Sequence, residues 1–441
     1  MRAYAFSMGL ILGLFTLLGA CEGPPEQPRS TPPSVEVADT LVNRNAGFRV
    51  KTGADQLVSE ALFKLEGKQV ALVANHTSMV GDRHLVDTLL ALGVNLVKVF
   101  SPEHGFRGTA DAGQRVRDSR DPETGLPIVS LYGSNKKPTP DQLADVDVVL
   151  FDIQDVGTRF YTYLSTLAYV LEACAEQQKL LLVLDRPNPN GWYVDGPVLQ
   201  PQNASFIGLH QIPIVHGMTL GEYAQLIAGE RWLGDSLDAT PYLQVEACVG
   251  YRHDMRWKTT GLPWIAPSPN LASEYAAYLY PALCWLEPTP VSVGRGTDSA
   301  FTLVGAPWYG PAANARQGEQ WSAHGLEATY HEFTPRSLPG KATHPKFQDE
   351  TCQGLDFQNR VDGQSLFLAG LTLLADLYRV HAQQRPGERF FQKGFERWPG
   401  TRDLQRQIEA GTSPQEIYQS WQEEVEAFKA IRQAYLLYPG Q

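Results

Sequence analysis

The stretch "DVDVVLFDIQD", Asp145 to Asp155, is an apolar run that ends in acidic and amide residues. It is followed by "YLSTLAYVLEACAEQQ" (Tyr163 to Gln178), which has apolar residues at helical spacing, and by a second apolar run, "KLLLVLDRPNP" (Lys179 to Pro189). Strands that are apolar at consecutive positions are usually buried on both faces, as in a parallel sheet covered by helices. The stretch therefore predicts a strand-helix-strand unit of a doubly wound α/β domain.

The same alternation occurs upstream of this stretch. "QVALVAN" (Gln69 to Asn75) and "NLVKVFS" (Asn95 to Ser101) predict two further strands. Between them "RHLVDTLLALG" predicts a helix that ends at Gly93. We therefore expect an α/β, Rossmann-like domain with a mostly parallel sheet over residues 45–238.

The pattern after this region is less regular. Thr219 and Glu222 stand at the spacing of a capping box, which predicts the start of a helix. Further on, "PVSVGRG" and "AFTLVGAPW" have strand-like composition, and helical stretches run around 364–383 and 412–435. These features predict a smaller α+β auxiliary domain over residues 239–441.

Residues 1–20 have the layout of a secretory signal peptide, with an apolar run that is short for a membrane span. The run ends in "LGAC", which resembles a bacterial lipobox and implies a lipid anchor on Cys21; the alternative is an ordinary signal followed by a chance cysteine. Residues 21–44 are rich in Pro, Ser and Glu, the composition of a tether. We expect an exported lipoprotein anchored to a membrane on its periplasmic side. Glu22 stands where an aspartate retention signal would be, which favours the outer membrane.

The charge balance and the cysteines restrict the partners. The 37 Lys and Arg residues against 48 Asp and Glu residues give a net charge of -11, which disfavours nucleic acid as a partner. Four cysteines follow Cys21 without a CxxC motif or metal-like spacing. Some could pair in an exported protein, but Cys174 lies in a helical apolar pattern and is expected to be a buried thiol.

Polar residues follow each predicted strand. The carboxyl ends of parallel strands meet at one edge of the sheet, where ligands bind in open α/β folds. The residues at these ends are Asn75, His76 and Thr77, then Glu103 and His104, then Asp152, Gln154 and Asp155, and finally Asp185, Arg186 and Asn188. We therefore expect one pocket at this edge, with Glu103 at its mouth and Pro102 and Gly105 shaping the turn.

Three reaction classes could use these groups. A partly buried carboxyl group such as that of Glu103 can protonate a leaving oxygen, as glycoside hydrolysis requires. A metal hydrolase is a weaker hypothesis, because no HExxH motif occurs among the candidate ligands, which are His76, His104, Asp152, His210 and His216. A serine hydrolase would need G-x-S-x-G, which is absent. The dinucleotide fingerprint and the P-loop are absent too, so no cofactor and no metal is predicted.

Ten blocks occur in the following order: "FSPEHGFRG", "AGQRV", "DPETGLPIVSLYG", "KKPTPDQL", "DVVLFDIQDVGTRFYTYLSTLAYVLEA", "LDRPNPNG", "DGPVL", "HGMTLGEYAQLI", "TGLPWIAPSPNL" and "SVGRGT". They resemble the signature blocks of the NamZ-type exo-β-N-acetylmuramidases, a bacterial family long known only as a domain of unknown function. The resemblance covers nearly all of the mature chain and is weakest after Trp308. It implies a Rossmann-like domain, an auxiliary domain and an active-site cleft between them.

The resemblance also implies an activity. The expected reaction is removal of terminal N-acetylmuramic acid from the non-reducing end of peptidoglycan-derived glycans or muropeptides, with Glu103 of the "PEHG" block as the general acid/base. Because this sugar carries a lactyl carboxylate, an arginine is its expected partner. At least one of three arginines in the blocks should bind it: Arg159, Arg186 or Arg295. The alternative is that they form ion pairs with Asp155, Asp185 or Asp298.

Other residues in the blocks are assigned supporting roles. The 2-acetamido group of the sugar can act as an internal nucleophile, which Asp152 or Asp155 could orient; alternatively these aspartates end a strand and cap a helix. His104 could hold Glu103, while Tyr161 and Tyr163 could stack on the sugar or belong to the core. Ser268 and Asn270 could reach the cleft or form a Pro-rich turn. The remaining substrate-binding candidates are Asn75, Arg107, Gln114, Gln154, Asp185, Asn188 and His216.

The alternative function is a non-catalytic lipoprotein that captures muropeptides in the same cleft. Glu103 separates the two hypotheses, because its replacement by glutamine should abolish turnover in the enzyme and change affinity only modestly in the receptor.

Overall fold

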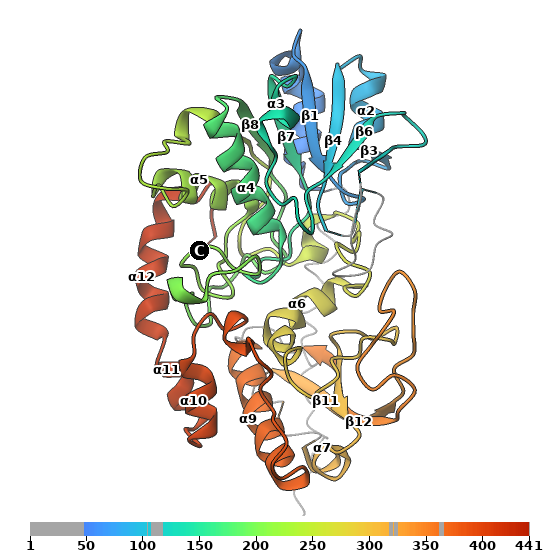
Figure 1. Ribbon diagram of the computed structural model, residues 1–441, viewed down its shortest axis with the longest axis vertical. Coiled ribbons are helices and arrows are strands. Elements are labelled where there is room, and N and C mark those ends of the chain that lie inside the picture. The colour runs from blue at the N-terminus through green and yellow to red at the C-terminus, as the bar shows by residue number, and fades with distance from the viewer. Residues whose placement is uncertain are drawn as a thin grey trace, which may run out of the picture. The chain divides into compact units, whose positions relative to one another are not determined.

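A seven-stranded sheet in the order β5-β6-β4-β1-β7-β8-β9 forms the centre of the N-terminal part of the chain (Figure 1). The computed structural model describes residues 48–440 apart from 104, 107–117, 317–320, 322–324 and 361–365. All neighbouring strands of the sheet are parallel except β5 and β6. The strands are β1 (Val70–Ala74), β4 (Leu96–Ser101), β5 (Ser119–Arg120), β6 (Pro127–Ser130), β7 (Val148–Asp152), β8 (Leu180–Leu184) and β9 (Leu243–Glu246).

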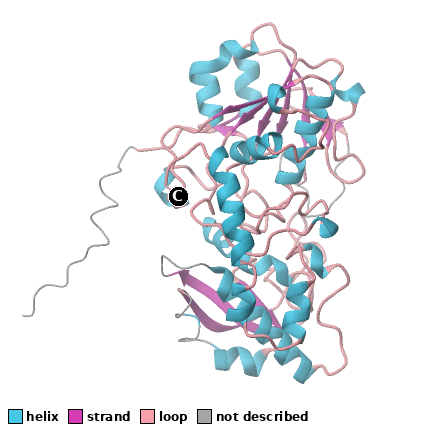
Figure 2. Ribbon diagram, turned by 90° about the vertical axis from the view of Figure 1, so that its left-hand side faces the viewer, coloured by secondary structure: helices cyan, strands magenta, loops and turns pink. Residues whose placement is uncertain are grey.

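Helices cover both faces of this sheet, and Figure 2 shows them flanking the strands. Successive side chains of a strand point to opposite faces, so β1 contributes to two cores. Ala71 and Val73 pack with α4 (Tyr163–Glu176), whereas Leu72 packs in the core that contains α2 (Leu85–Ala91). Burial on both faces explains the uninterrupted apolar runs, and it confirms the predicted Rossmann-like α/β class.

The predicted elements of this region are present with small shifts. The runs quoted above contain β1, β4, β7 and β8, and the predicted helices are α2 and α4. The capping box before α5 (Leu220–Gly229) is confirmed: Glu222 N donates to Thr219 Oγ1 at 3.2 Å, and Thr219 N donates to Glu222 Oε2 at 2.8 Å. Shorter elements are α1 (Gly53–Gln56), β2 (Met79–Val80), β3 (Arg83–His84) and α3 (Pro140–Leu143).

The C-terminal part contains a three-stranded antiparallel sheet in the order β10-β12-β11. Its strands are β10 (Leu303–Ala306), β11 (Leu326–Phe333) and β12 (Cys352–Arg360). The helices of this part are α6 (Glu274–Leu283), α7 (Gly310–Arg316), α9 (Leu366–Gln384), α10 (Asp403–Glu409), α11 (Pro414–Gln419) and α12 (Gln422–Arg432). Strands and helices together agree with a second, α+β region.

One sequence prediction in this part is confirmed only in part, and one is wrong. The helical stretch at 412–435 is divided into α11 and α12, because Trp421 leaves the helical conformation at φ -111°. The Trp421 ring is buried instead against Phe367, with ring centroids 5.8 Å apart. The run "PVSVGRG" forms no strand; within it Ser292 makes an isolated bridge to Gly305 of β10.

The described residues test some of the predictions about cysteines, membrane segments and domain boundaries, and leave others untested. Cys174, Cys248, Cys284 and Cys352 are buried free thiols, as expected for Cys174. No helix in the described part of the chain is long and apolar enough to cross a membrane. The signal peptide, Cys21 and the tether lie outside the described residues, and the domain boundary at residue 238 stays a prediction.

Candidate active site

A cavity of about 470 Å³ opens beside Glu103. This volume lies in the range that accommodates small ligands such as a sugar ring. Its walls come from segments far apart in the chain, and the polar side chains among them include Glu103, Tyr132, Thr162, Ser268, Glu287 and Arg295. The cavity therefore combines groups from the parallel-sheet region with groups from the C-terminal part.

Glu103 is carried by the turn that follows β4. The N–H of Gly105 donates to the carbonyl of Pro102 at 3.2 Å, and Gly105 has φ +76°. This left-handed conformation favours glycine, which explains the glycine of "PEHG". The turn leaves the Glu103 side chain partly buried at the cavity wall.

The N-terminus of α4 points at Glu103. Thr162 is the N-cap residue of this helix, but its side chain does not cap the helix. Its hydroxyl donates to Glu103 Oε2 at 2.7 Å instead. The start of α4 therefore supplies a side-chain hydrogen bond to Glu103 at the cavity wall.

Tyr132 is a second hydroxyl beside Glu103. It follows β6, and burial, the negative charge of Glu103 and hydrogen bonding to that carboxylate raise its pKa well above the ordinary value. Tyr132 is not among the site residues predicted from the sequence, because β6 has only 4 residues and begins with a proline. The signal was the short apolar run in "LPIVSLYG", which directly precedes this tyrosine.

Tyr161 and Tyr163 are buried, and both also line the cavity. Their rings pack edge to face with centroids 4.9 Å apart. The Tyr163 hydroxyl accepts a hydrogen bond from Asn75 Nδ2 at 2.9 Å and donates to the carbonyl of Pro267 at 3.1 Å. Asn75 is therefore connected to the cavity wall through Tyr163.

Arg295 lies in the cavity wall with Glu287 as its partner. The Arg295 Nε bonds Glu287 Oε1, and Nη2 bonds Oε2 at 3.1 Å. Burial opposes ionisation of Glu287, but the charge and hydrogen bonds of Arg295 hold its pKa below the usual value. The alternative partner predicted from sequence, Asp298, is wrong: that carboxylate is exposed and lies 3.4 Å from Lys341.

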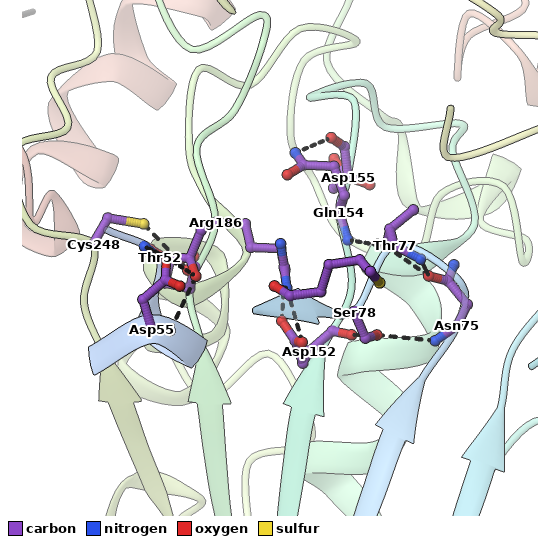
Figure 3. A network of polar contacts seen from close by, with 12 residues as sticks. Thr52, Asp55, Asn75, Thr77, Ser78, Asp152, Gln154, Asp155, Arg186 and Cys248 are labelled. Carbon is purple, nitrogen blue, oxygen red and sulfur yellow. Dashed lines mark hydrogen bonds and ion pairs between the residues drawn. The ribbon is translucent and has the colours of Figure 1, made fainter. Parts of the chain in front are cut away.

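The ends of β1, β7 and β8 form a separate polar network (Figure 3). Arg186 donates to both oxygens of Asp152, at 2.6 and 2.9 Å, and not to Asp185, which was the predicted ion-pair partner. The backbone N–H of Gln154 donates to Thr77 Oγ1 at 3.0 Å. The expected single pocket is thus divided, because Gln154 and Arg186 line a second cavity of only about 30 Å³.

Two further strand-end aspartates form hydrogen bonds inside the protein. Asp185 accepts hydrogen bonds from the hydroxyls of Thr219 and Tyr438, both at 2.6 Å, and burial raises its pKa to about 6. Asp155 accepts a bond from the N–H of Gly157 at 2.7 Å. It caps this turn and not α4, so the predicted helix-capping role of Asp155 is wrong.

Arg159 is bound by backbone carbonyls. Its Nη1 donates to Pro197 and Ile212, and its Nη2 donates to Trp398 and Pro399, at 2.7 to 3.0 Å. The predicted alternative, an ion pair of Arg159 with Asp155, is therefore wrong. Arg159 joins two parts of the chain, and it does not belong to the lining of the 470 Å³ cavity.

The other candidates are dispersed. Asn188 Nδ2 donates to the carbonyl of Met218 at 2.8 Å, and His216 Nδ1 accepts from the N–H of Met218 at 3.2 Å. Asn270 Nδ2 donates to the carbonyl of Lys341 at 2.7 Å, whereas Ser268 lines the large cavity. His104, Arg107 and Gln114 lie outside the described residues.

The candidate metal ligands do not come together in the part of the chain that the structure describes. His76 donates to the carbonyl of Ala266 at 2.7 Å, and His210 is hydrogen-bonded to the Tyr223 hydroxyl at 2.6 Å. Burial lowers the pKa of His210 to about 4 and that of His216 to about 3. His76, His210 and His216 therefore each contact a different residue.

A Rossmann-like fold with a glutamate at a helix N-terminus, in a sugar-sized cavity that also presents an arginine, has the features of a glycoside hydrolase. The comparisons with known proteins identify the family. Residues 70–275 match the N-terminal model, and residues 278–438 the C-terminal model, of exo-β-N-acetylmuramidase NamZ. The chain belongs to this family, and the predicted resemblance is confirmed.

Relatives with known sequence or structure support this family assignment. The peptidoglycan β-N-acetylmuramidase NamZ of Bacillus subtilis is 38% identical over 397 residues, which cover 88% of this chain and 92% of the relative. Two crystal structures of DUF1343 family proteins from Bacteroides fragilis have TM-scores of 0.75 and 0.79 at 40% and 30% identity. Each alignment covers 89% of this chain and 99% of the other.

Proposed function

We propose that this chain is an exo-acting glycoside hydrolase that releases N-acetylmuramic acid from the non-reducing end of peptidoglycan fragments. The observation that carries the proposal is the presence of Glu103 and Arg295 in the wall of one cavity of about 470 Å³. The 38% identical relative, which is a peptidoglycan β-N-acetylmuramidase, supports the same activity.

In this proposal Glu103 is the general acid/base. It protonates the glycosidic oxygen as the bond to the leaving sugar breaks, and it later accepts a proton from the attacking water. The hydrogen bond from Thr162 to Oε2 fixes the orientation of the carboxyl group for this exchange. The position at the cavity wall gives the substrate access to it.

The nucleophile in this proposal is the 2-acetamido group of the substrate. Glu287 also lines the cavity, but its two oxygens are bonded to Arg295. A carboxylate held in this way is poorly placed to attack the anomeric carbon. Substrate-assisted hydrolysis needs no second free carboxylate, so it fits the wall that the structure describes.

Arg295 is the arginine that we assign to the lactyl carboxylate. Its Nε and Nη2 face Glu287, while Nη1 has no hydrogen-bond acceptor within the described ranges. Arginine binds carboxylates well because its planar group offers five donors. Arg159 and Arg186 are occupied by backbone carbonyls and by Asp152, respectively, and neither lines this cavity.

The test compares a chromogenic β-N-acetylmuramide with the matching N-acetylglucosaminide, which lacks the lactyl group. The wild type should cleave only the muramide. Arg295→Lys should lower kcat/KM for the muramide roughly 10- to 100-fold, as expected for loss of a charge-assisted bond. Arg385→Lys, at an exposed arginine of a surface ion pair, is the matched control and should change nothing. If the wild type cleaved the muramide and the N-acetylglucosaminide equally well, the assignment of Arg295 to the lactyl carboxylate would be contradicted.

We also propose that the protein is a periplasmic lipoprotein, anchored through Cys21 after removal of the signal peptide, in the outer membrane. The "LGAC" sequence and Glu22 support this location. Cys21→Ser should move the protein from the membrane fraction to the soluble periplasmic fraction, with loss of fatty-acid labelling. A variant that stays membrane-bound and labelled would contradict the anchor.

A further inference from the structure

We infer that Tyr132 is a positioning residue for Glu103, and that its hydroxyl acts together with that of Thr162 to orient the carboxyl group that transfers the proton. The inference rests on the proposed function and deepens it. Tyr132 stands next to the reacting carboxyl group in the same cavity wall.

The strand register places the two side chains together. β4 and β6 are parallel neighbours, and Ser101 of β4 is aligned with Ser130 of β6. The N–H of Leu131 extends this pairing by donating to the carbonyl of Ser101 at 2.8 Å. Glu103 and Tyr132 each follow the aligned serines by two positions, so both lie just beyond the same edge of the sheet.

A row of aromatic rings lies beside Tyr132. Its ring lies against Phe206 with centroids 6.2 Å apart, and Phe206 stacks on Tyr169 at 6.1 Å with an angle of 9°. Lys136 Nζ lies 4.4 Å from the Phe206 centroid. Tyr132 therefore packs against an aromatic side chain as well as lying beside Glu103.

Two hydroxyls thus approach Glu103 from different elements. Thr162 donates to Oε2 from the start of α4, and Tyr132 interacts with the carboxylate from the end of β6. Hydrogen bonds donated to a carboxylate favour its ionised form. Removing either hydroxyl should therefore make the protonated form of Glu103, which is the acid, persist to higher pH.

Other charged or titratable groups line the same cavity and are left unchanged by the test. They are Tyr161 and Tyr163 at the start of α4, Lys136 after β6, and Glu287 and Arg295 after α6. His104 and Arg107 lie outside the described residues. Comparison of single-hydroxyl variants with the wild type therefore isolates the contribution of each hydroxyl.

The experiment is the pH profile of kcat/KM on the chromogenic β-N-acetylmuramide, which reports the essential acid of the free enzyme. Tyr132→Phe should move the basic limb to higher pH by about half to one pH unit, the effect of one hydrogen bond. Thr162→Val should shift the limb in the same direction. Tyr169→Phe is the matched control, because it removes a phenol from the same aromatic row without altering the cavity lining, and its profile should superimpose on that of the wild type.

A second variant separates positioning from a merely structural role. Site-specific replacement of Tyr132 by a fluorotyrosine keeps the ring but makes the phenol a stronger donor, so the basic limb should move to lower pH. If the wild type cleaves the muramide but neither substitution at Tyr132 moves the limb, the inference is wrong while the proposed function stands. If the wild type does not cleave the muramide at all, the proposed function fails and the inference fails with it.

Discussion

Two parts of one sheet edge, built from similar residues, differ in how their carboxylates are bound. Beyond β4 and β6, Glu103 meets neutral hydroxyls and faces a cavity of about 470 Å³. Beyond β7 and β8, Asp152 is fully buried beneath Arg186, next to a cavity of about 30 Å³. Only the first arrangement leaves a carboxyl group that can exchange a proton with a ligand.

The difference arises from what covers the edge. The small cavity is lined by Trp257, Leu262 and Ile265, which come from the segment after β9 and fill the crevice over the ends of β1, β7 and β8. Polar groups beneath such a cover must satisfy one another, because a buried charge without a partner is costly. We therefore interpret the Asp152 network as scaffold and the Glu103 side as the reaction centre.

The largest expected effect is on Glu103. Glu103→Gln removes the transferable proton but keeps an acceptor for the hydroxyl of Thr162. Turnover of the chromogenic muramide should fall about 10²- to 10⁴-fold, the usual contribution of general acid/base catalysis. Binding of free N-acetylmuramic acid and the urea midpoint of unfolding should change little. Retention of more than about a tenth of the activity would contradict the role of Glu103.

The corresponding change of carboxylate to amide at Asp152, on the other part of the sheet edge, should affect stability and not turnover. Asp152→Asn leaves Arg186 buried without a compensating charge, and the free energy of unfolding should fall by about 3–5 kcal/mol. Urea unfolding with linear extrapolation measures this difference. Asp145→Asn is the matched control near the start of β7, because the Asp145 carboxylate is 54% exposed in its ion pair with Lys98 and should contribute less than about 1 kcal/mol.

The opposite outcome for Asp152 would remove the distinction between the two regions. If Asp152→Asn unfolded at the same urea concentration as the wild type but lost turnover as completely as Glu103→Gln, the catalytic role predicted for Asp152 from the sequence would be supported. The present position gives that role no support, since Asp152 is 0% exposed and bonded through both oxygens.

The strand ends themselves could be predicted from the sequence, because they depend on local patterns. Consecutive apolar residues followed by polar ones located Glu103 and Asp152 at the same edge of the sheet. Which carboxylate faces a ligand could not be predicted in this way. It depends on Trp257 and its neighbours, which lie about a hundred residues further along the chain than Asp152 and cover only one part of the edge.

The partners of the arginines and the role of Tyr132 show the same limit. Arg295 has Asp298 three residues away, yet it bonds Glu287 across a turn whose carbonyls are held by Lys346. Tyr132 is placed by strand register, which is a property of the pairing of β4 and β6 and not of either run alone. Local sequence thus predicted the helices, the strands and the residues near the site. It did not predict which of several nearby residues each side chain contacts.

The smallest expected effect concerns Asp155, which follows the end of β7. Burial raises its pKa from 3.8 to about 7, and its Oδ1 has no hydrogen-bond partner in the described part of the chain. Because the folded protein binds this proton more tightly than the unfolded chain, the associated stability is fully present below about pH 4. It is lost as the pH rises through about 7.

Asp155→Asn should therefore stabilise the protein at pH 8 by about 1–3 kcal/mol and have little effect at pH 4. The asparagine oxygen can still accept the hydrogen bond from the N–H of Gly157. The measurement is urea unfolding of both proteins between pH 4 and pH 8. Asp185, whose pKa burial raises to about 6, titrates in both proteins, so the difference between the two curves reports Asp155 alone. Parallel curves would show that water reaches Asp155, which would place it with Glu103 on the open side of the edge and not with the buried network.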